Sequence, residues 1–90
     1  MKAQQTITRP NGAEVKIVAE ECFGAGLHRS VSVFVLYRGS NAEEWSLASD
    51  RPHPDWRSMS VEKYKRHGRS KMLQVATPAE ILKTINQLEK

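Results

Sequence analysis

The sequence predicts an α+β fold, in which a small antiparallel sheet of four to five strands is covered by one C-terminal helix. Three observations predict it: a hairpin signal near the N-terminus, a run of β-branched residues in the middle, and a helix with clear start signals at the end. The 90 residues have room for one core, so residues 1–90 are expected to form a single domain.

The hairpin signal is Pro10-Asn11-Gly12 between two alternating segments, Thr6–Arg9 and Ala13–Ile17. A two-residue turn at Asn11-Gly12 would place Ile7 opposite a lysine. A three-residue loop, with Gly12 in the left-handed bulge position, instead places Ile7 opposite Val15 and Gln5 opposite Ile17. The longer loop gathers the apolar side chains on one face and is therefore the prediction.

The next two strands follow the same logic. The second strand is expected to run to Glu20 or Cys22, before two closely spaced glycines, and the third covers 29–38. The third strand is apolar on one face throughout and carries Phe34 and Leu36 on the other, a pattern typical of a central strand covered on both sides. A turn then leads to a fourth strand over 44–49, in which Trp45 is expected to lie in the core.

Residues 56–71 leave two possibilities open. Pro52 and Pro54 make the preceding segment a surface loop. After it, Ser60 can cap a short helix that ends at Gly68, or the stretch can be a loop. Residues 71–76, with Met72, Leu73 and Val75, predict a short fifth strand.

The C-terminal helix has the strongest start signals in the chain. Thr77 is a suitable N-cap, Pro78 fits the first turn, and Glu80 stands where a capping box requires it. An apolar stripe follows at helical spacing, made by Ile81, Leu82, Ile85 and Leu88. Because a helix of this length is marginal alone, the stripe is expected to pack on the sheet.

Composition narrows the function classes. The longest apolar run, 33–37, is far shorter than the roughly 20 residues of a membrane helix, and residues 1–6 hold no apolar stretch typical of a secretion signal. A single cysteine, Cys22, excludes an internal disulfide and a multi-cysteine zinc site. We therefore expect a cytoplasmic protein without a membrane partner.

The charge is unevenly distributed. The net charge is +4, but residues 1–50 carry −1 and residues 51–90 carry +5. A basic segment without acids supplies candidate phosphate contacts, with Tyr64 as a candidate for stacking on a base: Lys63, Tyr64, Lys65, Arg66, Arg69 and Lys71. The leading hypothesis is a non-enzymatic domain that binds nucleic acid or another polyanion. The structural alternative is a solvated basic surface.

A second class of function is protein interaction. Trp56 and Arg57 follow the proline loop, so the 52–57 loop can present an aromatic anchor to a partner, unless Trp56 folds back onto the sheet. A sheet edge is the other candidate surface, and an acidic protein would suit the basic segment. An edge strand can also pair with a second copy, so both a monomer and a homodimer remain open.

Catalysis has little support in the sequence. His28, His53 and His67 lack the spacing of metal ligands, so no metal or other cofactor is predicted. A small ribonuclease using His67 with Tyr64 and neighbouring cations remains a remote alternative, because no base and orienting group are placed by the sequence. We therefore assign no catalytic residues.

Overall fold

The computed structural model describes residues 2–23, 29–41, 44–49, 60–67 and 70–89. Four strands form one antiparallel sheet in the order β1-β2-β3-β4: β1 (Lys2–Thr8), β2 (Glu14–Phe23), β3 (Arg29–Arg38) and β4 (Ser46–Ser49). Helical segments complete the described chain: α1 (Val61–His67), α2 (Ser70–Leu73), α3 (Pro78–Asn86) and the 3₁₀ turn η2 (Gln87–Glu89).

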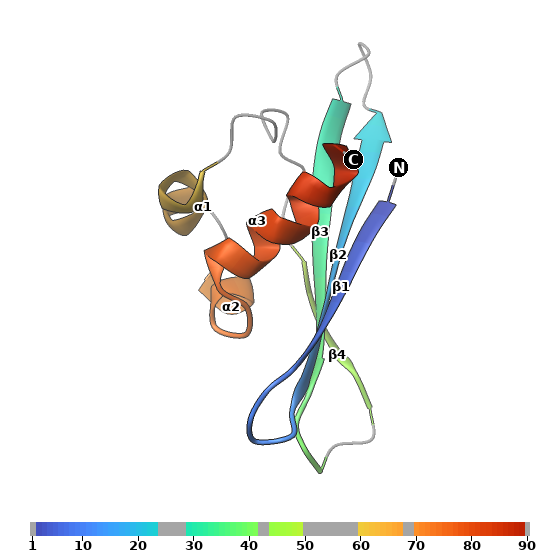
Figure 1. Cartoon of the computed structure of the whole chain (residues 1–90), viewed down its shortest axis with the longest axis vertical. Coiled ribbons are helices and arrows are strands. Elements are labelled where there is room, and N and C mark those ends of the chain that lie inside the picture. Colours follow the sequence, from blue (N-terminus) through green and yellow to red (C-terminus); the bar gives the residue numbers. More distant parts are fainter. Residues whose placement is uncertain (1, 24–28, 42–43, 50–59, 68–69, 90) are drawn as a thin grey trace.

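The predicted α+β class is confirmed: a four-stranded antiparallel sheet carries a C-terminal helix. Helices α1, α2 and α3 all lie on the same side of the sheet (Figure 1). Helix α3 packs on β1 and β2, whereas α1 packs on α3, on the side away from the sheet. The helical side is therefore two helices deep at α1, which leaves the outer surface of α1 to solvent.

The β1–β2 hairpin has the predicted three-residue loop. Ile7 pairs with Val15 and Gln5 with Ile17. The Arg9 N–H donates to the Ala13 carbonyl oxygen at 2.8 Å, which closes the loop. Gly12 has a φ of 90°, the left-handed conformation that the bulge position requires and that glycine adopts without a Cβ clash.

The core lies between the sheet and α3. On β3, Val31, Val33 and Val35 have no solvent exposure, and Ile17 is likewise buried opposite Val35 on β2. All four apolar residues of the predicted α3 stripe are also buried: Ile81, Leu82, Ile85 and Leu88. This match between alternating strands and a helical stripe confirms the expected packing of the last helix on the sheet.

The start of α3 has the predicted capping box. The Glu80 N–H donates to Thr77 Oγ1 at 3.2 Å, and the Thr77 N–H donates to Glu80 Oε1 at 2.9 Å. Further along, the Thr84 hydroxyl lies 3.0 Å from Gln5 Oε1, so a polar contact also joins α3 to β1. The two contacts fix where α3 begins and how it lies on the sheet.

The predicted fifth strand over 71–76 is wrong. Residues 70–73 form α2, and the chain then turns, with the Ala76 N–H donating to the Met72 carbonyl oxygen at 3.0 Å. Met72 and Ala76 are both buried. Their spacing of four residues is helical, and the apolar run was too short for periodicity to distinguish a strand from a helical turn.

For residues 56–71 the sequence left a short helix or a loop open, and the part of this segment that the structure describes is helical. The Lys63 N–H donates to Ser60 Oγ at 3.2 Å, as expected of the predicted N-cap. The predicted stop, Gly68, and the proline loop before Ser60 lie outside the described residues. Among the helices of the described chain, none is long and apolar enough to cross a membrane.

Candidate functional site

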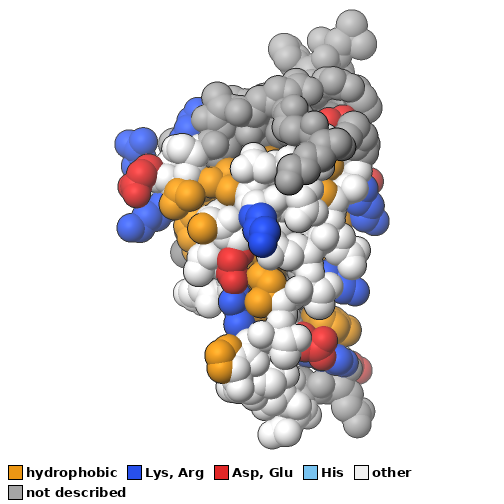
Figure 2. All heavy atoms as spheres, viewed as in Figure 1, with side chains coloured by type: hydrophobic (Ala, Val, Ile, Leu, Met, Phe, Trp, Pro, Cys, Tyr) orange, Lys and Arg blue, Asp and Glu red, His pale blue; other side chains and the backbone are white. Residues whose placement is uncertain are grey.

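Helix α1 separates its charged side chains from its aromatic one. Tyr64 has no solvent exposure and belongs to the hydrophobic core. Lys65 and Arg66, the next two residues, are exposed, and Lys63 is partly exposed. Because successive residues of a helix point about 100° apart, burying Tyr64 against α3 directs its two followers to solvent. Figure 2 shows blue side chains gathered at the edge where α1 lies.

The predicted stacking role of Tyr64 is not supported by its position. Its side chain is fully buried, so the ring presents no face on which a base could stack. The aromatic residue instead anchors the helix that carries the cations. As far as its side chains are described, the candidate surface therefore consists of charges alone.

The remaining predicted cations divide between described and undescribed residues. Lys71, on α2, is exposed beside the buried Met72. Arg69 lies outside the described residues, as do Trp56 and Arg57 of the predicted partner-binding loop. We call the described cations the basic surface: Lys63, Lys65, Arg66 and Lys71.

The basic surface is short enough to meet one stretch of a polyanion. Arg66 and Lys71 are five residues apart in the chain, so their Cα atoms lie no more than about 18 Å from each other. That distance corresponds to about five phosphates along one strand of a duplex. Only Glu62 on α1 brings an acid among these cations in the described part of α1 and α2.

Arg9, a further arginine, has a structural role. Arg9, at the β1–β2 turn, donates to both Glu80 carboxylate oxygens, at 2.6 and 2.8 Å, and to the Val75 carbonyl oxygen at 2.9 Å. Its hydrogen bonds hold the pKa of Glu80 at about 2, well below the ordinary value of 4.5. This bidentate pair joins the hairpin to the start of α3 and takes no part in the basic surface.

The far side of the sheet carries residues that the sequence did not identify as a candidate site. Trp45, just before β4, is 36% exposed, and Leu47 is 56% exposed. The Arg38 guanidinium carbon lies 4.7 Å from the centroid of the Trp45 ring, and Lys16 Nζ lies 5.4 Å from it. Arg38 is also held by an ion pair with Glu14.

The expectation that Trp45 lies in the core is therefore wrong. In the observed register, Ala48 pairs with Val35 on the core side and Leu47 pairs with Leu36 on the other side. A shift of one residue would exchange these faces, and the sequence does not determine that register. The available signal was the second apolar face of β3, formed by Phe34 and Leu36, which predicts a cover that the described helices do not provide.

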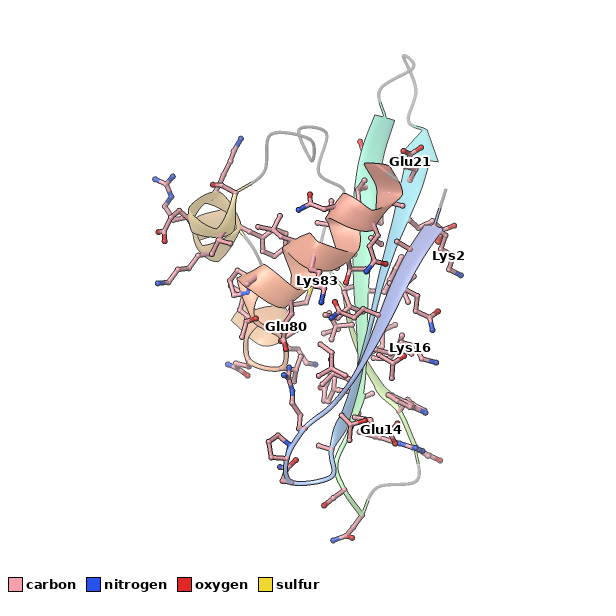
Figure 3. The ribbon with its side chains drawn as sticks, in the orientation of Figure 1. Lys2, Glu14, Lys16, Glu21, Glu80 and Lys83 are labelled. Atoms are coloured by element: carbon pink, nitrogen blue, oxygen red, sulfur yellow. The ribbon has the colours of Figure 1, made fainter. Side chains whose placement is uncertain are left out.

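We call this side of the sheet the open face. Its central side chains lie on the three strands β2, β3 and β4: Lys16, Val18, Glu20, Phe34, Leu36 and Leu47. Val18 is buried, yet it is not part of the core cluster beneath the helices. In Figure 3, Lys16 lies on the side of the sheet away from α3, whereas Glu80 and Lys83 lie on the helical side.

The described residues offer little for catalysis. A hollow of about 430 Å³ between α1 and α3 is lined by Val61, Ala79, Leu82, Lys83, Asn86 and Gln87. Among the residues that the structure describes, this lining contains one cation and no carboxylate or imidazole. The ribonuclease alternative also loses Tyr64, which is buried. Nowhere in the described chain do three or more histidine, cysteine or acidic side chains gather as a metal site would require.

Comparisons with known proteins add no assignment. No protein-family model, curated protein sequence or solved structure matches the chain. The function is therefore argued from the chain's own residues.

Proposed function

We propose that this protein is a non-enzymatic binding domain of the cytoplasm that contacts the phosphates of nucleic acid through its basic surface. The observation that carries the proposal is the division within α1: Lys65 and Arg66 are exposed, whereas Tyr64 between them and the core is fully buried. Among the described side chains, this surface has cations and no exposed ring, and such a surface neutralises phosphates without recognising bases. We therefore expect binding that depends little on sequence.

The rest of the fold supports the same assignment. Tyr64 and Ser60 fix α1, so the cations stand on a helix. Lys71 extends the surface onto α2, and Arg69 joins the two helices in the sequence. Clustering cations on one side of a small domain raises its attraction for a polyanion above that of an evenly spread charge.

The test is fluorescence anisotropy with labelled single-stranded and duplex DNA and RNA of about 20 nucleotides, at about 50 mM salt, where phosphate contacts contribute most. Lys65→Glu/Arg66→Glu is the test variant. Lys2→Glu/Lys83→Glu is the matched control, because it reverses the same number of exposed lysine or arginine charges elsewhere. We expect the first variant to weaken binding at least about tenfold and the second less than about threefold.

Two outcomes would contradict the proposal. If the wild-type protein binds none of the four probes at about 50 mM salt, the basic surface is a solvated surface. If both variants weaken binding equally, the effect is one of total charge, and α1 is not the contact surface. Circular dichroism of each variant confirms that the fold is retained.

A second candidate function, recognition of a protein through a sheet edge, is favoured by one observation. Strand β1 lies at the edge of the sheet and is seven residues long, with Lys2 as its single charged residue and no proline. An edge strand with so little charge can accept an added strand from a partner. A partner bound in this way would bind the Lys65→Glu/Arg66→Glu variant as well as the wild type.

A further inference from the structure

The open face has an alternating charge pattern on its central strand. Lys16, Val18 and Glu20 point away from the helices, since Val15, Ile17 and Ala19 between and beside them are buried in the core. Val18 lies opposite Phe34 on β3. The face thus has an apolar centre, with a cation two residues to one side and a carboxylate two residues to the other.

We propose that the open face stacks on the same face of a second copy of this chain, with the strands of the two sheets antiparallel. Consider a two-fold axis that lies midway between the two sheets, runs perpendicular to the strands and passes over Val18 of β2. This axis reverses the direction of the strands in the second copy. It therefore places Lys16 of each copy opposite Glu20 of the other, and Val18 and Phe34 opposite their own counterparts. The pattern is complementary to itself in this orientation alone, because parallel stacking would place Lys16 opposite Lys16.

The dimensions of a sheet pair agree with this arrangement. Packed sheets lie about 10 Å apart, a gap that a lysine and a glutamate side chain span together. The proposed contact also covers Leu36, which pairs with Lys16 and therefore lies opposite Ser32 of the second copy, the residue that pairs with Glu20. Covering Leu36 removes apolar surface that isolated sheets seldom leave in water.

The size of the face sets the expected affinity. Strands β2 and β3 have ten residues each, and β1 and β4 are shorter. With about 3.3 Å per residue and about 4.8 Å between strands, the parts of the two faces that lie opposite each other cover about 400 Å², or about 800 Å² for two copies. This is the size of a weak, transient interface, so we expect a dissociation constant in the micromolar range or above it.

The test is a charge swap followed by sedimentation velocity from about 1 to about 500 µM, a range that brackets a micromolar dissociation constant. Lys16→Glu places two carboxylates opposite each other at both contacts, and Glu20→Lys does the same with two cations. We expect each single variant to weaken dimerisation at least about tenfold. The double variant Lys16→Glu/Glu20→Lys restores opposite charges and is expected to dimerise within about threefold of the wild type.

Three results would overturn the proposal. The first is a wild-type protein that stays monomeric at the highest concentration. The second is a double variant that folds, as judged by circular dichroism and thermal melting, but does not recover the dimer lost in the single variants. Single variants that dimerise as well as the wild type would equally exclude this face, and would direct attention to pairing through the β1 edge.

Discussion

Arg9 and Glu80 form the contact on which the relative position of hairpin and helix depends. Three hydrogen bonds from one guanidinium hold the Glu80 carboxylate and the Val75 carbonyl, two residues before the helix N-cap. Both side chains of the ion pair are about one quarter exposed. A bidentate pair of this kind has a fixed geometry, so it contributes more than a typical surface ion pair.

The lowered pKa of Glu80 predicts an acid-sensitive part of the stability. Because the folded value, about 2, lies below the ordinary 4.5, the pair stabilises the fold above pH 4.5 and the stabilisation is lost as the pH falls toward 2. With solvent screening, we expect the wild type to lose about 1 kcal/mol more than Glu80→Gln between pH 7 and pH 3.

The measurement for this prediction is urea unfolding, followed by circular dichroism at both pH values. Arg9→Gln removes the partner of the carboxylate and is expected to reduce the pH dependence as Glu80→Gln does. Parallel pH curves for the wild type and both variants would show that the pair does not shift the titration of Glu80.

At the scale of an element, the β1–β2 turn and the turn after β3 predict different changes in stability when the glycine in each is replaced by alanine. Gly12 has a φ of 90°, and an added Cβ would lie 3.2 Å from Ser40 Cβ. Gly39, after β3, has no atom within 4 Å of such a Cβ. We expect Gly12→Ala to cost about 1 to 2 kcal/mol, about 5 to 10 °C in Tm, and Gly39→Ala to change Tm by less than about 3 °C.

Thermal melting followed by circular dichroism measures both variants. Equal changes in Tm would mean that the hairpin tolerates an alanine at the bulge position. In that case the register that pairs Ile7 with Val15 would need another cause than the turn.

Some elements of this fold could be predicted from the sequence, and others could not. The hairpin, β3 and α3 were predictable because their signals are local: a turn sequence, a long β-branched run and a capping box. The α2 turn was not, since Met72 and Ala76 occupy a run too short to show a period. The side of the sheet on which Trp45 lies could not be predicted either, because it depends on the register of β4 against β3.

For the whole molecule, two surfaces on opposite sides of the sheet have separate roles in our proposals. The basic surface on α1 and α2 lies on the helical side, where Figure 1 places both helices. Lys16 and the open face lie on the other. A dimer through the open face would therefore leave both basic surfaces exposed, one on each outer side of the dimer.

The candidate site shows the same division between local and long-range information. The cations of 63–71 could be identified from the sequence because a charged run has no need of tertiary context. The burial of Tyr64 could not, because it depends on α1 packing against α3. That burial changes the expected recognition from bases and phosphates to phosphates alone.

The slope of the logarithm of the association constant against the logarithm of the salt concentration tests the central claim most directly. Each phosphate contact to duplex DNA contributes about −0.9 to the slope of the logarithm of the association constant. The three exposed cations Lys65, Arg66 and Lys71 predict a slope of about −2.7 between about 50 and 200 mM salt, and contacts from Lys63 and Arg69 as well would extend it to about −4.5. Binding with a slope near zero, or no binding at the lower concentration, would contradict recognition through phosphates.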